Sequence, residues 1–149
     1  MARLSIEDMN NLSGVSEEDL DKLYKQFRAA HTKIFNDINK WISLCDKALE
    51  YLNKLDNTYD NDIIVHKTAK EMYYKGSLIL DDVDLFEYYT HEYQSILTKL
   101  NNNKMIGNTM VLLEILKNNK QPVVNRLSEC YGMYSEAYDR LNKEDTYEG

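Results

Sequence analysis

Residues that form turns and disulfides are scarce in this sequence. Its 149 residues include one proline, five glycines and two cysteines. A multi-stranded sheet needs a turn signal roughly every 8 to 12 residues, and this chain has too few of them. Two cysteines do not build a disulfide framework, so the sequence predicts a reducing compartment and a cytoplasmic location.

Long apolar runs are also missing. The longest one, Met110 to Leu116, is interrupted by Glu114 and falls far short of the roughly 20 residues that a membrane span requires. The first residues contain no apolar signal-peptide core. The net charge of −7 argues against broad neutralisation of duplex DNA, which needs a basic face. The sequence therefore predicts an acidic, soluble protein with no membrane contact.

One apolar seam dominates the first third of the chain. Its members recur at every seventh position: Leu20, Phe27, Ile34, Trp41, Ala48 and Leu55. Because this period returns side chains to one helix face, it predicts a single helix over residues 16–56, about 60 Å long. A helix of that length would protrude from a compact domain of this size. We therefore expect a partner chain to cover part of the seam, as in a coiled coil.

The remaining sequence predicts three to four shorter helices packed along the long one, which makes the expected fold an all-α bundle. These helices are expected at 62–75, 81–101 and 104–118, with a last one from Pro122 onward. Gly76 is expected to end the first of them, and residues 77–80 are either extended or helical. A capping box at Ser5 predicts a short helical arm in residues 1–14. A single domain over 15–143 and a frayed tail at 144–149 complete the expected organisation.

Helix 104–118 differs from the others because it is apolar over most of its circumference. Such a helix is either central in its domain or covered by another chain. The sequence does not decide between these two arrangements.

Signatures of catalysis and of metal or cofactor binding are absent. The chain has neither a Gly-x-Ser-x-Gly elbow nor a phosphate-binding glycine loop. No histidine has glutamate three residues before it, the arrangement that di-metal helical bundles use. The acidic run at 56–62 lacks the spacing of a calcium loop and is interpreted as a solvated turn. The sequence therefore predicts no enzyme, no cofactor and no metal site.

A cysteine–histidine dyad receives little support from the spacing of these residues. His31 and Cys45 share the long predicted helix but lie about 21 Å apart along its axis, which is too far for a dyad. Pairing of Cys130 with His66 or His91 remains open, without a supporting motif. The plainer interpretation is that both cysteines are small buried thiols.

Tyrosine is the most distinctive side chain, with 12 residues that include several clusters. Its ring combines large apolar area with a polar tip, which suits half-wet interfaces and stacking on nucleic-acid bases. Packing at the margins of helices explains many of them, but adjacent pairs such as Tyr73 and Tyr74 cannot both face one core. We assign a partner interface to Leu20, Phe27, Ile34, Trp41, Tyr88 and Tyr131.

Charge is unevenly distributed along the chain. Residues 81–92 hold five acids and neither lysine nor arginine, whereas residues 99–126 hold five cations and one acid. Cations in such runs are usually solvated, yet these are the only plausible patch for nucleic acid: Lys99, Lys104, Lys117, Lys120 and Arg126.

Together these patterns favour a non-enzymatic interaction or assembly protein that forms a homo-oligomer through the Leu20–Leu55 seam, with a further protein partner expected. The 15 asparagines fit an AT-rich coding genome, so an accessory or virion-assembly factor of a phage is one setting, in the host cytoplasm or the virion. The alternative is a regulator of nucleic acid or of an enzyme that acts on it. Such a regulator would use the basic patch, or its acidic residues 81–92 as a decoy for a basic protein.

Overall fold

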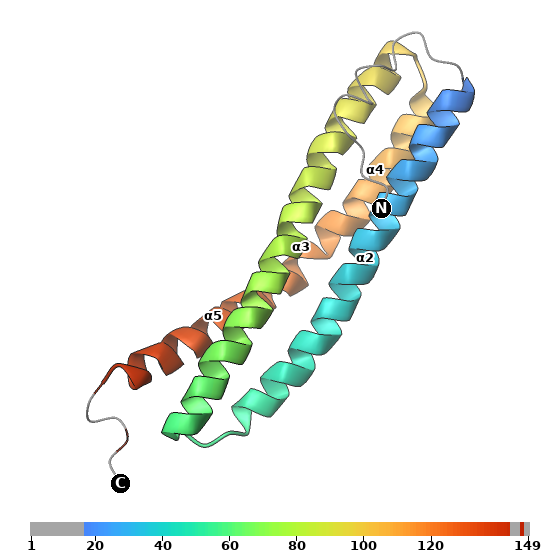
Figure 1. Cartoon of the computed structure of the whole chain (residues 1–149). Helices are drawn as coiled ribbons and strands as arrows, with labels where there is room; N and C mark the ends of the chain where they lie inside the picture. The colour runs from blue at the N-terminus through green and yellow to red at the C-terminus, as the bar shows by residue number, and fades with distance from the viewer. Residues whose placement is uncertain (1–16, 144–146, 148–149) are drawn as a thin grey trace. The chain divides into compact units, whose positions relative to one another are not determined.

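The chain is all-α in a computed structural model, which describes residues 17–143 and residue 147. Figure 1 shows its helices, α2 (Glu17–Asn53), α3 (Tyr59–Lys99), α4 (Asn103–Asn118) and α5 (Lys120–Leu141). No strand occurs in the described residues. The predicted all-α fold is confirmed. The arm predicted for residues 1–14 and all of the predicted tail except residue 147 lie outside the described part.

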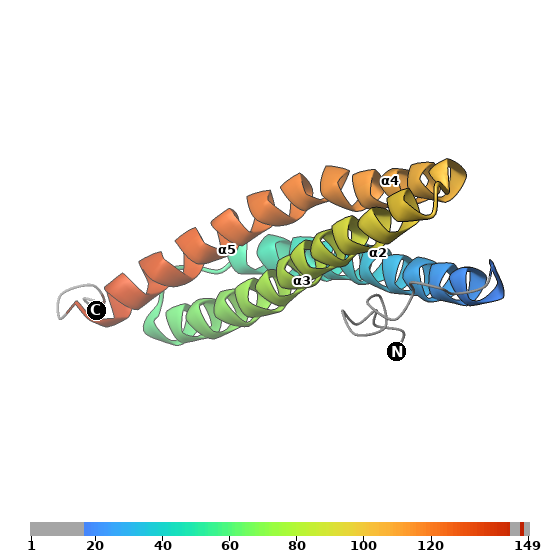
Figure 2. The same ribbon diagram turned by 90° about the horizontal axis from the view of Figure 1, so that it is seen from above.

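The described chain divides into two compact units. Unit 1 combines α2 up to Asp37 with α3 from Leu80 onward and with α4. Unit 2 combines α2 from Ile38 with α3 up to Ile79 and with α5. In Figures 1 and 2, unit 1 is the set of blue, yellow and light-orange segments, and unit 2 is the set of cyan, green and red-orange segments. Each unit is therefore built from three helical segments.

Aromatic side chains fill the core of unit 1. Phe27 of α2 packs against Phe86 and Tyr93 of α3, with ring centroids 4.6 and 5.8 Å apart. All three rings are buried. The Tyr93 hydroxyl contacts Sδ of Met105 in α4 at 3.2 Å, and Thr109 of α4 is buried as well. One face of α4 thus covers the core that lies between α2 and α3.

In unit 2, α2 and α3 pack closely where Trp41 contacts Gly76. Trp41 is buried, and its Nε1 donates a hydrogen bond to the carbonyl of Met72 in α3 at 3.1 Å. A Cβ atom on Gly76 would lie 2.4 Å from Cζ2 of Trp41, so only glycine leaves room for the indole. The predicted helix end at Gly76 is therefore wrong. Helix α3 continues through residues 77–80 for 41 residues and is longer than α2, which has 37.

The asparagine-rich turn after α3 ends that helix and begins the next, as predicted. Asn101 has a φ of 55°, a left-handed conformation that asparagine tolerates at a helix end. The side chain of Asn102 then accepts a hydrogen bond from the backbone N–H of Met105 and caps α4. Pro122 lies in the first turn of α5, where its missing N–H costs nothing.

Candidate interaction site

The residues of the predicted seam are covered by the chain's own helices. Leu20 and Phe27 are buried in unit 1, Ile34 is half-buried there, and Trp41 is buried in unit 2. These side chains therefore do not offer the surface to a partner chain that the sequence led us to expect. A heptad pattern predicts that one helix face is covered, but the covering helices can come from the same chain.

In unit 1 the predicted basic patch meets the predicted acidic run. Lys120 Nζ lies 2.8 Å from Oδ1 of Asp84, and Lys117 Nζ lies 3.8 Å from Oε2 of Glu87. Both carboxylates belong to α3, whereas Lys117 belongs to α4 and Lys120 is the first residue of α5. The two opposite charge runs therefore partly neutralise each other within unit 1.

Arg126, which belongs to unit 2, is also paired. Its Nε and Nη2 donate to Oδ1 and Oδ2 of Asp46 at 2.7 and 3.0 Å, a bidentate contact between α5 and α2. The hydrogen bonds from Arg126 hold the pKa of the Asp46 carboxyl below its usual range. Lys99 and Lys104 are the exposed members of the patch that form no ion pair within the described residues. Within residues 17–143 the patch is thus reduced to two cations without an ion pair.

The two tyrosines assigned to an interface lie in different units. Tyr88 of unit 1 is 47% exposed and contacts the ring of Tyr89 at 5.8 Å. Tyr131 of unit 2 is 53% exposed, and its ring lies 5.9 Å from Tyr73 and 5.2 Å from Tyr134. Tyr131 therefore belongs to a larger aromatic cluster.

That cluster joins α3 to α5 in unit 2, and Tyr134 lies at its centre. The rings of Tyr131, Tyr73 and His66 are 5.2, 5.7 and 6.1 Å from the ring of Tyr134. His66 also contacts Tyr138 at 5.7 Å. Burial, together with the neighbouring Tyr73 and Tyr131, raises the pKa of Tyr134.

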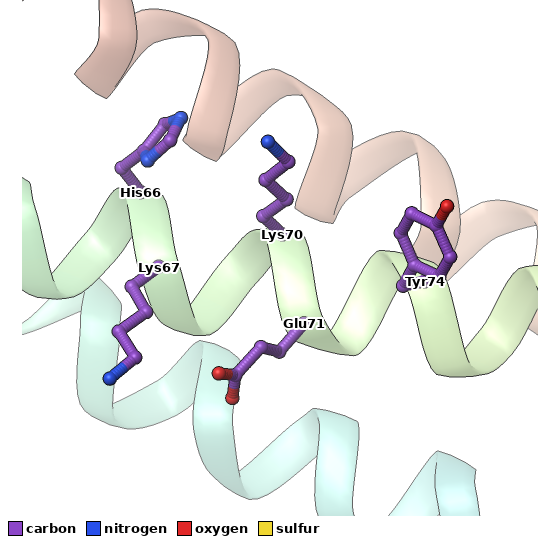
Figure 3. A pocket seen from close by; sticks show the side chains of 5 residues that line it. All are labelled: His66, Lys67, Lys70, Glu71 and Tyr74. Atoms are coloured by element: carbon purple, nitrogen blue, oxygen red, sulfur yellow. The ribbon is translucent and has the colours of Figure 1, made fainter.

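The cluster lines a groove of about 600 Å³, which we call the tyrosine groove. Its lining residues are His66, Lys70, Tyr131, Tyr134, Ser135, Tyr138 and Asp139. A second hollow of about 350 Å³ adjoins it and shares His66 and Lys70 with it. Figure 3 shows both shared side chains directed toward α5, whereas Lys67 and Glu71 point toward α2. Within the described residues, Lys67 and Lys70 form no ion pair.

Sequence reasoning missed several residues of this groove, although a signal for them exists. His66 and Lys70 follow i, i+4 spacing on α3, and the tyrosines of α5 at positions 131, 134 and 138 follow i, i+3, i+7 spacing. Each set therefore occupies one helix face. The sequence does not show that these two helix faces pack against each other.

Asp62 departs from the solvated turn that the sequence predicted. Its carboxylate is 2% exposed and accepts two hydrogen bonds from Arg140 of α5, at 2.8 and 2.9 Å. The hydroxyl of Tyr147 contacts the same carboxylate. The hydrogen bonds from Arg140 lower the pKa of Asp62. Asp62 is therefore a buried structural anion of unit 2.

Metal-ligating side chains in the described residues do not gather into a metal-binding group. No set of three His, Cys, Asp or Glu side chains there is placed to hold a metal ion. The Sγ of Cys130 lies against that of Cys45, and no contact joins either thiol to a histidine. What the tyrosine groove offers is ring faces, phenol hydroxyls, an imidazole and an ammonium group. These groups can hydrogen-bond to a ligand and stack against it.

In comparisons with known proteins, no family model, no curated protein and no solved structure matches this chain. None of the helices in the described part has the length and apolarity that crossing a membrane would demand.

Proposed function

We propose that this chain is a non-enzymatic interaction protein that binds a segment of a different protein in the tyrosine groove. The observation that carries the proposal is the exposure of Tyr131 and Tyr138, at 53% and 56%, beside a concave surface. Tyrosine is enriched at interface hot spots because it buries a large rigid area at low cost in side-chain entropy. The neighbouring rings already hold these side chains in place.

The groups around the groove favour a partner segment that carries a carboxylate next to an aromatic or aliphatic side chain. Lys70 and the phenol hydroxyls are donors, and Lys70 has no ionic partner in the described residues. The exposed ring faces accept an apolar side chain. Asp139 at the rim disfavours a polyanion, which would approach several phosphates at once.

The other hypotheses have weaker support. Self-association through the Leu20–Leu55 seam would compete with the packing that buries Leu20, Phe27 and Trp41. Direct contact with nucleic acid would draw on a patch in which Lys117, Lys120 and Arg126 already hold carboxylates. The asparagine-rich composition still favours an AT-rich genome, so assembly of a phage particle remains one setting for the proposed interaction.

Selection from a random peptide library tests the proposal and requires no candidate partner. The immobilised full chain should enrich peptides that combine Asp or Glu with Tyr, Phe, Trp or Leu. A synthetic enriched peptide should lose about 30-fold or more in affinity for the Tyr131→Ala/Tyr138→Ala double variant, since one hot-spot residue is typically worth about 2 kcal/mol.

Tyr51→Ala is the matched control, because Tyr51 lies on α2 of the same unit, is 55% exposed and does not line the groove. Its affinity for the peptide should equal that of the original chain. Equal binding by the double variant, or equal losses in all variants, would place the interaction elsewhere.

A further inference from the structure

Two cysteines from distant parts of the sequence meet in the core of unit 2. Cys45 lies on α2 and Cys130 on α5, and both are fully buried. Their Sγ atoms are 3.6 Å apart, although the residues are 85 positions apart in the chain. Both thiols are free. The two cysteines of this chain are thus each other's nearest reactive partner.

This distance is short enough for a bond to form with little rearrangement. A disulfide has an S–S length of about 2.05 Å, so bond formation requires the two sulfurs to approach by only roughly 1.5 Å. Because both sulfurs are buried, a thiol on another chain cannot reach them in the folded state. The geometry therefore selects an intramolecular product.

We propose that Cys45 and Cys130 form an oxidation site, at which a small hydroperoxide converts the two thiols to a disulfide that links α2 to α5. The first sulfur attacks the peroxide, its S–O bond forms as the O–O bond breaks, and water or an alcohol leaves. The second sulfur then displaces hydroxide from the sulfenic acid and forms the S–S bond, and a second water leaves. The thiols lose two electrons in total, which the peroxide gains.

The contact between the two sulfurs does not set the order of these steps, because either thiol can be the hydrogen-bond donor. The thiolate is the nucleophile, so whichever sulfur ionises attacks the peroxide and the other resolves the sulfenic acid.

A peroxide titration of the full chain tests the site. Under native conditions with hydrogen peroxide, the count of free thiols should fall from two to zero, and peptide mapping should find a Cys45–Cys130 linked peptide in the monomer. A dithiol reductant should restore both thiols once the oxidised chain is unfolded in urea. The oxidised form should keep its helical circular dichroism and show a higher urea midpoint, because the cross-link closes a long loop.

Two results would overturn the proposal. One is retention of both thiols in the folded chain under peroxide that oxidises the urea-unfolded chain. The other is loss of the thiols to sulfinic acid, sulfonic acid or intermolecular disulfides without the linked peptide. Methionine oxidation adds oxygen to the mass and is separated from the thiol reaction in the same peptide map.

Single variants distinguish a reactive pair from two cysteines that merely fill space. In Cys45→Ser and in Cys130→Ser the resolving thiol is missing, so a sulfenic acid on the remaining cysteine should accumulate and be trapped by a 1,3-dicarbonyl reagent. Cys45→Ala repeats the first measurement if the buried hydroxyl disturbs folding, which circular dichroism reports. Trapping in either variant supports the site and identifies the attacking sulfur, and trapping in neither would contradict the site.

Discussion

Gly76 shows how one missing Cβ atom decides the packing of a helix. Replacing an interior helical glycine by alanine normally stabilises a protein by about 1 kcal/mol. At Gly76, however, a Cβ would lie 2.4 Å from Trp41 Cζ2 and 2.7 Å from Leu127 Cδ2. We expect Gly76→Ala to lower the free energy of unfolding by about 1 to 2 kcal/mol, because overpacking outweighs the helical gain. Urea denaturation monitored by Trp41 fluorescence measures the change.

Gly132 is the internal control, since it lies on α5 of the same unit and a Cβ there would meet nothing within 4 Å. Gly132→Ala should therefore raise the free energy of unfolding by about 0.5 to 1 kcal/mol. If both substitutions changed stability in the same direction, the close packing assigned to Gly76 would be wrong.

His31 makes the stability of unit 1 sensitive to pH. Its Nε2 is buried and has no hydrogen-bond partner within the described residues. Burial lowers the pKa of His31 from 6.5, more strongly than the Leu112 backbone raises it, and the charge of Arg28 lowers it further. Below about pH 6.5 the unfolded chain therefore binds this proton more readily than the folded chain, and stability declines as the pH falls.

The expected result is a urea midpoint that falls between about pH 7.5 and pH 5.5 in the original chain and falls less in His31→Phe, which cannot titrate. His91→Gln serves as the control, because His91 is exposed on α3. Identical pH dependence in the original chain and in His31→Phe would refute the role assigned to this imidazole.

At the scale of elements, the Asp62–Arg140 pair joins the start of α3 to the end of α5. Arg140→Met would leave the Asp62 carboxylate buried without its cation, and we expect a loss of about 3 kcal/mol. Asp62→Asn should cost less, since the Arg140 side chain is 27% exposed and can be hydrated. Chemical denaturation at neutral pH compares the two variants, and a larger loss in Asp62→Asn would contradict this account.

The Asp62–Arg140 pair also makes the free energy of unfolding depend on pH in the acidic range. Because Arg140 lowers the pKa of Asp62 below its ordinary value of 3.8, its contribution to stability is complete above about pH 4 and is lost as the pH falls below that value. The free energy of unfolding of Asp62→Asn should therefore depend less on pH in this acidic range than that of the original chain.

Element by element, the sequence predicted the helices better than their boundaries. The heptad seam identified α2, and the asparagine-rich turn marked the junction of α3 and α4. The helix end predicted at Gly76 was wrong because a glycine in a helical pattern can either end the helix or leave room for a neighbouring side chain. Only the packing of Trp41, which is 35 residues earlier in the chain, distinguishes these two roles. Local sequence does not contain that information.

At the scale of the whole molecule, the limits of prediction lie in contacts between helices. The apolar period predicts which face of α2 is covered. It does not predict that α3, α4 and α5 are the helices that cover it. For the same reason, Tyr131 was assigned to an interface from its residue type, whereas His66 and Lys70, which line the groove with it, were not. The meeting of Cys45 with Cys130 is a further contact between distant residues that no local pattern reveals.

The seam of α2 is filled by the chain's own helices, which leaves the tyrosine groove as the surface that we propose for a different protein. Sedimentation equilibrium over a wide concentration range measures whether a second chain covers the seam instead. We expect the mass of one chain, 17.5 kDa, at every concentration. A reversible dimer that forms as concentration rises and is abolished by Ile34→Asp, with helical circular dichroism unchanged, would show that the seam is an interface between chains.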